Sequence, residues 1–154
     1  MFQVVLHRPE IPPNTGNIIR LCANTGVSLH LIHPLGFAMD DARLRRAGLD
    51  YREYAEVAEH SSFESYLSYA RPARLFALSG QASDWYADCR FTEGDAFLFG
   101  SESVGLDARL LIHPSVTRVL RIPMLPNRRS LNLANSVAIV LFEAWRQSGF
   151  AGAV

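Results

Sequence analysis

The sequence predicts an α/β fold in which a mainly parallel sheet carries helices on both faces. Short apolar segments alternate along the chain with longer segments whose apolar residues recur at helical spacing. Some short segments are apolar throughout, as at residues 96–99, which is typical of parallel strands buried on both faces. A chain of 154 residues is most simply one domain, so we expect residues 1–154 to form a single unit.

Strands and helices are expected to alternate from the N-terminus onward. Strands are predicted at residues 2–6, 28–32, 74–79, 96–99 and 116–122, and a short strand is expected within 51–57. Helices are predicted from residue 14 to Gly26, from Asp40 to Gly48, from Ser61 through Tyr69, over 107–111 and over 131–145, with a weak helical segment around Trp85 and Tyr86.

Capping residues mark where three of these helices are expected to begin. Prolines make residues 7–13 a rigid connector without a continuous helix, after which Asn14-Thr15 offers N-caps. Ser61 and Glu64 have the spacing of a capping box. Ser130 is the expected N-cap of the last helix.

The last predicted helix carries more apolar surface than one core contact requires. Between Leu131 and Trp145 the apolar side chains span an arc of roughly 200° on a helical wheel, far wider than one core-facing stripe. We therefore expect this helix to bury one side in its own core and part of another side against a second surface. The basic loop before it, with Arg128 and Arg129, is a suitable place for a ligand site.

The charges balance, with 15 acidic residues against 15 basic ones, and every basic residue is arginine. Zero net charge argues against indiscriminate binding of nucleic acid but permits a local basic patch. Arginine suits bidentate phosphate contacts, although genomic base composition is the better explanation for the absence of lysine. Arg43, Arg45 and Arg46 are expected in the last turn of a short helix, where they complement the helix dipole and are also placed to touch phosphates.

Cysteine and histidine usage argues against several other kinds of site. Cys22 and Cys89 show no CxxC spacing, which suits unpaired thiols in a reducing cytoplasm. The five histidines lack ligand spacing such as HExxH, so they are expected at the surface or at helix ends, and no metal is expected. The N-terminus lacks a signal-type apolar region, and no run approaches the ~18 apolar residues of a membrane span. We therefore expect a cytoplasmic protein that does not bind membranes.

Three predicted strand exits are candidates for a ligand site. In open α/β sheets, ligands bind where loops leave the carboxyl ends of the strands. The exits lie at residues 78–80, 99–102 and 122–125, and glycine in the first two and at position 105 lets the backbone approach a ligand closely. Such exits are often only turns, and the sequence contains neither a GxGxxG after the first strand nor a P-loop.

Three separated segments resemble the motifs of the SPOUT methyltransferases. They are Asn14–Arg20, Phe99–Leu106 and Arg129–Asn135, which occur in the family's order and at sensible distances. The resemblance runs essentially end to end, because residues 10–13, 44–51 and 143–146 match as well. It is closest to the small, single-domain branch that methylates the ribose 2′-oxygen at the wobble position of tRNA.

The resemblance implies a deep trefoil knot near the C-terminus, an obligate homodimer, and S-adenosylmethionine held bent in the knot. The surplus apolar arc of the last helix would then be dimer surface, and the strand exits would surround the methyl donor. The expected product is S-adenosylhomocysteine, and no metal is needed because the donor already carries a positive charge. The family positions expected to hold or shape the cofactor site are Leu78, Gly100, Glu102, Gly105, Ile122 and Ser130.

The resemblance also implies which residues handle the RNA, expected to be the anticodon loop of tRNA. Arg20 matches the family's catalytic arginine, although taken without the family it is better explained as a solvated surface residue. Because arginine is effectively never deprotonated, we expect Arg20 to orient the 2′-hydroxyl and stabilise developing negative charge. Arg129 is expected to clamp a phosphate. Further positioning and RNA contacts are expected from Asn14, Asn132, Arg43 and Arg46.

Three residues depart from the family pattern. Asp107, Ala134 and Phe142 stand where proline, serine and tyrosine are usual, and none of them removes a residue that the chemistry requires. Two other functions remain open alternatives. One is a knotted methyltransferase acting on ribosomal RNA ribose, and the other is a non-catalytic dimer of ordinary doubly wound fold that binds RNA or a nucleotide.

Overall fold

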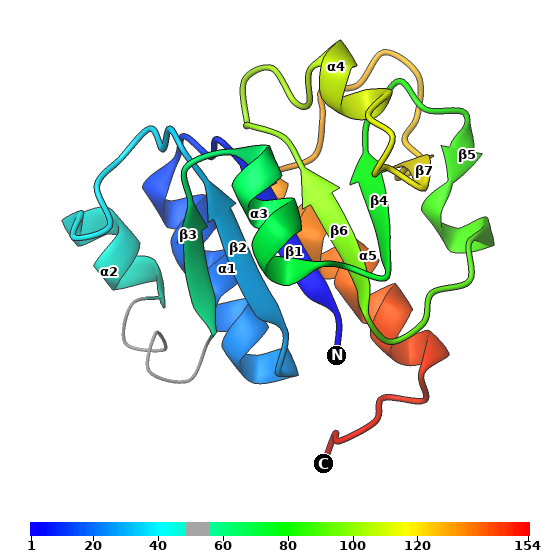
Figure 1. Cartoon of the computed structure of the whole chain (residues 1–154), viewed down its shortest axis with the longest axis horizontal. Coiled ribbons are helices and arrows are strands. Elements are labelled where there is room, and N and C mark those ends of the chain that lie inside the picture. Colours follow the sequence, from blue (N-terminus) through cyan, green and yellow to red (C-terminus); the bar gives the residue numbers. More distant parts are fainter. Residues whose placement is uncertain (49–55) are drawn as a thin grey trace.

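Seven strands form one sheet in the computed structural model, which describes residues 1–48 and 56–154 (Figure 1). In chain order the strands are Gln3–His7 (β1), Ser28–Ile32 (β2), Val57–His60 (β3), Arg74–Leu78 (β4), Asp84–Trp85 (β5), Asp95–Phe99 (β6) and Arg118–Arg121 (β7). Across the sheet they run β3-β2-β1-β6-β4-β7-β5, and each described pairing is parallel. The predicted parallel sheet is therefore confirmed.

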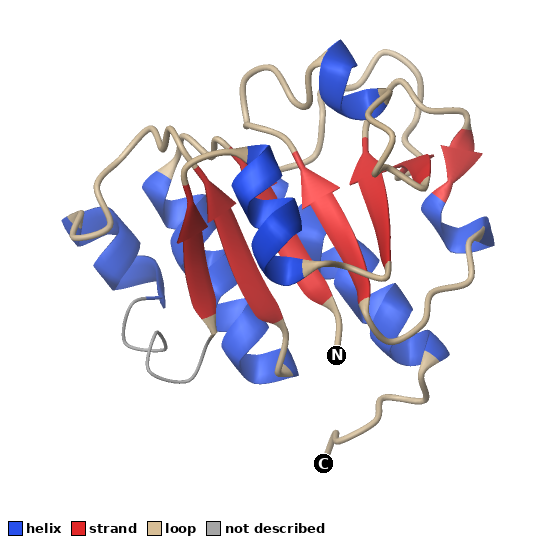
Figure 2. Cartoon of the chain, in the orientation of Figure 1, coloured by secondary structure: helices blue, strands red, loops and turns tan. Residues whose placement is uncertain are grey.

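Helices cover both faces of this sheet, as predicted (Figure 2). They are Pro12–Thr25 (α1), Ala42–Gly48 (α2), Phe63–Ala70 (α3), Ala108–Leu111 (α4) and Leu133–Gln147 (α5). Figure 1 shows α1 and α5 on one face and α3 on the other. Helix α2 lies against α1 at Gly16, where an added Cβ would come within 2.5 Å of the Ala47 Cβ, so only glycine permits this approach.

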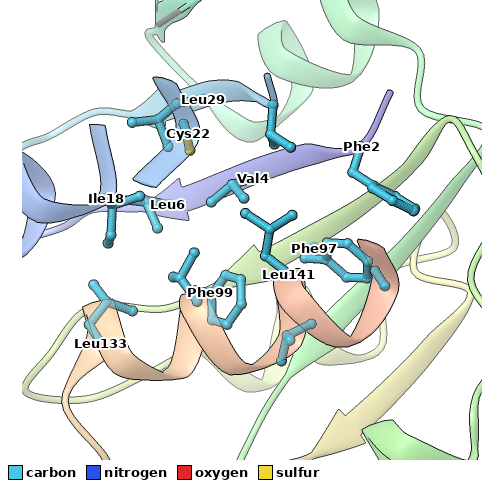
Figure 3. Packing of buried hydrophobic residues seen from close by; sticks show 14 of the residues in the cluster. Phe2, Val4, Leu6, Ile18, Cys22, Leu29, Phe97, Phe99, Leu133 and Leu141 are labelled. Atoms are coloured by element: carbon cyan, nitrogen blue, oxygen red, sulfur yellow. The ribbon is translucent and has the colours of Figure 1, made fainter. Parts of the chain in front are cut away.

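The larger apolar cluster lies between the sheet and the helices α1 and α5 (Figure 3). Val4 of β1 and Phe97 and Phe99 of β6 face Leu141 of α5 within it, and each side chain is at most 3% exposed. Burying one such side chain stabilises a fold by roughly 1.5–3 kcal/mol relative to leaving it in water. This cluster therefore holds α5 against the centre of the sheet.

The opposite face of the sheet has its own apolar cluster. Successive side chains of a strand point to opposite faces, so Val5 and Leu98 alternate with the residues of the first cluster and pack with Phe63 and Tyr66 of α3. The hydroxyl of Tyr66 donates to Oε1 of Gln3 at 3.0 Å. Burial on both faces explains why the central strands are apolar at consecutive positions.

Helix α5 begins later than the sequence predicted. Its N-cap is Asn132, whose side-chain oxygen accepts a hydrogen bond from the backbone N–H of Asn135 at 3.2 Å. Ser130 lies two residues before this cap, so the prediction that Ser130 caps the helix is wrong. Serine and asparagine are both good N-caps, and the sequence alone did not distinguish them.

Helix α1 begins earlier than the sequence predicted. Pro12 and Pro13 form its first two positions, and Ile11 precedes them without a side-chain cap. Proline is tolerated in the first turn of a helix because the backbone N–H groups there have no partner within the helix. The prolines therefore start the helix, whereas we had expected them to delay it. Gly26, with a φ of 67°, ends the helix as predicted.

The capping box of α3 lies one residue further along than predicted. The Ser62 hydroxyl accepts from the N–H of Ser65 at 3.0 Å, and the Ser65 hydroxyl accepts from the N–H of Ser62 at 3.1 Å. The predicted pair, Ser61 and Glu64, is wrong by one residue. Two adjacent serines offered two registers, and the one that buries Phe63 was formed.

One smaller prediction also needs correction. The segment expected to be weakly helical forms the strand Asp84–Trp85, which pairs with β7, followed by a 3-10 helix at Tyr86–Asp88.

A short strand was expected within residues 51–57. Strand β3 includes Val57, whereas residues 51–55 lie outside the described residues, so the prediction is not tested there.

Three histidines are buried, contrary to the expectation that histidines lie at the surface or at helix ends. His7, His30 and His60 are 8%, 4% and 7% exposed. Nδ1 of His30 lies 3.0 Å from Nε2 of His60, so the two rings share a hydrogen bond. Burial is the main reason that the pKa of His30 is lowered to about 4, and the nearby His60 contributes.

Among the described residues, none of the helices combines the length and the apolar character needed to cross a bilayer. The described residues also hold no group of three or more His, Cys, Asp or Glu side chains placed to bind a metal ion. The threading of the C-terminal segment into a knot stays a prediction.

Candidate active site

A cavity of about 560 Å³ opens at the carboxyl ends of the central strands. Three neighbouring strands contribute to it, because Leu78 ends β4, Gly100 follows β6 and Ile122 follows β7. The three exits that the sequence singled out therefore meet in space. The cavity is lined by all six residues expected at the cofactor site, namely Leu78, Gly100, Glu102, Gly105, Ile122 and Ser130.

The loop after β6 folds tightly back on itself to form one wall of the cavity. Ser101 and Gly105 pair as an antiparallel bridge, and Gly105 has a φ of 69°, which favours glycine. A Cβ added to Gly100 would lie 2.0 Å from the carbonyl carbon of Gly105. Any side chain at position 100 would therefore force this wall open.

Glu102 ties the loop after β6 to the start of α1. Its carboxylate accepts hydrogen bonds from the backbone N–H of Glu10 at 2.7 Å, from that of Ile11 at 3.1 Å, and from Nδ2 of Asn14 at 3.3 Å. A carboxylate beside the N-terminus of a helix also interacts favourably with the helix dipole. Glu102 thus fixes where α1 begins relative to the cavity.

Asn14 continues this connection to α5. Its Oδ1 accepts from Nδ2 of Asn132 at 2.9 Å, and Asn132 is the N-cap of α5. Both asparagines line the cavity. Glu102, Asn14 and Asn132 therefore form one hydrogen-bonded chain, and each comes from a different one of the three motif segments.

A second contact joins the loop after β6 to the loop before α1. The hydroxyl of Ser103 donates to Oε1 of Glu10 at 2.6 Å. The backbone of Glu10 is in turn packed against Gly36, where an added Cβ would come within 2.7 Å of the Glu10 Cα. Sequence reasoning did not single out this pair, because residues 10 and 103 are far apart in the chain and neither type is unusual in a loop.

The arginines expected to serve catalysis or RNA binding lie outside the lining of this cavity. Arg20 is exposed on α1, and Arg129 is exposed in the loop before α5. A second hollow, between α1 and α5, is lined by Asn17 and Leu21 and shares Asn132 with the first. Residues 17, 20 and 21 share one side of a helix, so Arg20 lies on the side of α1 that faces this second hollow.

The cluster on α2 is arranged differently from the prediction. Arg43 lies in the first turn of α2, not the last, and its guanidinium contacts the Asp41 carboxylate, with Nη2 to Oδ2 at 3.2 Å. This hydrogen bond to Arg43 lowers the pKa of Asp41. Arg45 and Arg46 occupy the last turn, as predicted, and are exposed.

Comparison with known proteins agrees with this arrangement. Residues 1–142 match the family described as the SpoU rRNA Methylase family. This chain belongs to that family. The resemblance to the SPOUT methyltransferases, which was inferred from three short motifs, is thereby confirmed.

Relatives with high sequence identity match this chain over nearly its whole length. A protein of Burkholderia cenocepacia (strain HI2424) is 58% identical over 155 residues, covering 99% of each chain, and is named tRNA (cytidine(34)-2′-O)-methyltransferase. A protein of Escherichia coli (strain K12) with the same name is 51% identical and covers 100% of this chain and 98% of its own.

Solved structures of other proteins share the fold. One, described as giving insights into the 2-OH methylation of C/U34 on tRNA, has a TM-score of 0.91 and 44% identity, and 97% of each chain is covered. An AdoMet-bound rRNA methyltransferase from Sinorhizobium meliloti has a TM-score of 0.84 and 27% identity, covering 94% of this chain and 56% of its own. The similarity therefore extends from sequence to three-dimensional structure.

Proposed function

We infer that this protein transfers a methyl group from S-adenosylmethionine to the ribose 2′-oxygen of nucleotide 34, a cytidine or uridine, in tRNA. The observation that carries the proposal is the match over essentially the whole chain to relatives that bear this activity in their names. The reaction forms an oxygen–carbon bond and breaks the sulfur–carbon bond of the donor. The hydroxyl proton is released, and S-adenosylhomocysteine leaves as the product.

The cavity at the strand ends fits the methyl donor. Its volume of about 560 Å³ lies within the usual range of small-molecule sites, and it combines apolar side chains with exposed backbone groups. Among the described residues that line it, Glu102 alone carries a formal charge, which suits a cationic ligand. Leu78, Gly100 and Ile122 would hold the donor mainly through backbone groups, with Ser130 beside them.

The donor supplies an electrophilic methyl carbon, so the remaining task is to present the 2′-hydroxyl and favour loss of its proton. We assign this task to Arg20, whose guanidinium stays charged and can hold the oxygen as negative charge develops. The chain of Glu102, Asn14 and Asn132 supports this assignment, because it fixes the start of the helix that carries Arg20.

The RNA is held from outside the cavity. Arg129 would clamp a phosphate, and the exposed Arg46 and the Asp41-bound Arg43 would contact the anticodon loop. Phosphate contacts of this kind make RNA binding weaken steeply as the salt concentration rises.

We further propose that the protein is a cytoplasmic homodimer. Phe142 of α5, which is 44% exposed, supports a second buried surface on this helix.

Methylation of unmodified tRNA tests the function directly. Wild-type protein, S-adenosylmethionine and unmodified tRNA should yield a 2′-O-methyl mark at nucleotide 34 on nucleoside mapping. Ribosomal RNA should remain unmarked in the same assay. A mark on ribosomal RNA alone would contradict the tRNA assignment, and no heat of binding with S-adenosylmethionine in calorimetry would contradict any methyltransferase activity.

Replacement of Arg20 tests its assigned role. The variant Arg20→Ala should bind S-adenosylmethionine as the wild type does but lose methyl transfer by at least about a hundredfold, because one donor to the developing charge is gone. Arg109→Ala, on α4 and outside the cavity lining, is the matched control and should keep its activity. Normal turnover by Arg20→Ala would remove Arg20 from the mechanism.

A further inference from the structure

We propose that the side chains of Ile11, Val104 and Leu131 form an apolar platform for the nucleobase of the nucleotide being methylated. We call these three residues the rim platform. The proposal rests on the proposed function and adds how the target base is held. None of the residue roles proposed above involves that base.

The side chains of the rim platform line the cavity and are nevertheless exposed to solvent, a combination that is unusual for apolar residues. Each of its residues lines the cavity, yet Ile11 is 44%, Val104 83% and Leu131 40% exposed. Deeper in the same cavity, the apolar side chains of Phe99 and Leu133 are only 3% and 9% exposed. The apolar surface at the mouth therefore faces solvent, as a contact surface for an incoming group would.

Hydrogen bonds hold the three segments of the rim platform together. The backbone N–H of Ile11 donates to Glu102, two residues before Val104 in the same tight loop. Asn132, directly after Leu131, donates to Asn14 of the helix that Ile11 precedes. The platform is thus assembled from three distant segments and positioned by the same network that shapes the cavity.

The chemistry of the reaction indicates which group of the RNA lies at the rim platform. The base is bonded to the sugar carbon next to the one that carries the reacting hydroxyl, so a 2′-oxygen presented at the cavity brings its base to the mouth. A phosphate would seek arginine, and no described residue in the cavity lining is an arginine. A neutral planar ring, by contrast, is well matched to exposed apolar side chains.

Two polar side chains beside the rim platform already have hydrogen-bond partners. Asn14 uses its Nδ2 for Glu102 and its Oδ1 for Asn132, and the Ser103 hydroxyl donates to Glu10. The platform itself carries no side-chain donor or acceptor that distinguishes cytosine from uracil. Contact without hydrogen-bond reading would admit both pyrimidines, which agrees with the C/U34 description of the solved relative.

A double-mutant cycle tests whether Val104 touches the base. One partner is the variant Val104→Ala, and the other is an anticodon stem-loop with an abasic ribose at position 34, which keeps the 2′-hydroxyl. With the cytidine substrate, Val104→Ala should lower kcat/KM by about fivefold, the loss expected for removing apolar contact area. With the abasic substrate the same variant should change kcat/KM by less than about twofold.

Two controls accompany the cycle. Ile112→Ala removes a side chain that is 82% exposed but does not line the cavity, and it should leave kcat/KM unchanged on both substrates. Val104→Leu restores apolar area and should recover most of the activity on the cytidine substrate. Calorimetry with S-adenosylmethionine should give wild-type affinity for both Val104 variants, since the base contact is separate from the cofactor.

Three outcomes overturn the rim platform. Equal losses on the cytidine and abasic substrates would mean that Val104 does not contact the base. Dissociation of Val104→Ala in analytical ultracentrifugation, where the wild type is a dimer, would assign the rim to a contact between subunits. Finally, if the wild type does not methylate nucleotide 34 at all, the proposed function fails and the platform fails with it. This result differs from one in which nucleotide 34 is methylated but Val104→Ala has the same effect on the cytidine and abasic substrates. In that case only the platform fails.

Discussion

At the scale of single residues, Glu102 holds more of the site together than any other side chain described here. Its two oxygens accept from three donors, which belong to Glu10, Ile11 and Asn14. Removing an acceptor from partly buried donors costs roughly 1–3 kcal/mol when the donors find no replacement. A residue expected only to shape the cofactor pocket therefore also anchors the start of α1.

Substitution of Glu102 should show both roles. Glu102→Ala should lower the free energy of unfolding by roughly 1–3 kcal/mol and weaken cofactor binding, because all three donors lose their partner. Glu102→Gln keeps one acceptor oxygen and should retain part of both properties. Urea unfolding and calorimetry with S-adenosylmethionine measure the two effects.

Glu64→Gln on α3 serves as the control for this pair. Glu64 is exposed and belongs to the helix on the opposite face of the sheet, so its replacement should leave cofactor binding unchanged. If Glu102→Ala matched this control in both measurements, the hydrogen-bonded chain would have no energetic importance.

At the scale of elements, the N-terminus of α5 serves the helix and the cavity at once. Asn132 accepts from Asn135 as the N-cap and donates to Asn14 across the cavity. Capping residues contribute about 1 kcal/mol to helix stability. The hydrogen bond to Asn14 fixes how α5 is oriented relative to α1, which the cap alone does not do.

Two substitutions at position 132 should separate these contributions. Asn132→Asp keeps an acceptor for the cap but has no N–H to offer Asn14, so it should retain most of the stability while losing methyl transfer at least severalfold. Asn132→Ala loses both bonds and should also be destabilised by about 1 kcal/mol. Urea unfolding and kcat/KM with tRNA, measured on the same preparations, distinguish the two. Equal activity of Asn132→Asp and the wild type would show that the bond to Asn14 is dispensable.

At the scale of the whole molecule, the buried histidines make stability depend on pH. Burial lowers the pKa of His30 to about 4 and also lowers the pKa of His60. The unfolded chain should titrate near 6.5. Below pH 6.5 these imidazoles therefore bind protons in the unfolded state but stay neutral in the folded state until the pH is lower. The free energy of unfolding consequently falls as pH falls.

The expected loss is about 1.4 kcal/mol per pH unit for each imidazole that titrates fully in the unfolded state, and for His30 it levels off near pH 4. Carboxylates with lowered pKa, such as Asp84 beside Arg118, act at lower pH because their unfolded value is already about 4. Urea unfolding between pH 4 and 8 should show the histidine loss. His30→Asn, which does not titrate, should flatten the dependence in this window. A fall as steep in His30→Asn as in the wild type would contradict the assignment to His30.

Much of the architecture was predictable from local patterns. Continuous apolar runs such as 96–99 marked the strands, and helical spacing with Gly26 at the end marked α1. These predictions held because burial on both faces of a sheet, and on one side of a helix, imposes periods that the sequence displays directly. Helix starts were less predictable. Neighbouring residues such as Ser61 and Ser62 are chemically equivalent caps until packing selects one register.

The sequence by itself determined the parallel sheet, the three strand exits and, through three spaced motifs, the family. Tertiary structure alone decided which distant groups meet: Glu102 with Asn14, Ser103 with Glu10, and His30 with His60. These contacts join residues 30 to 93 positions apart, and a hydrogen bond depends on distance and direction in space. No local period in a sequence encodes either of these, so the contacts appear only once the strands have taken their order in the sheet.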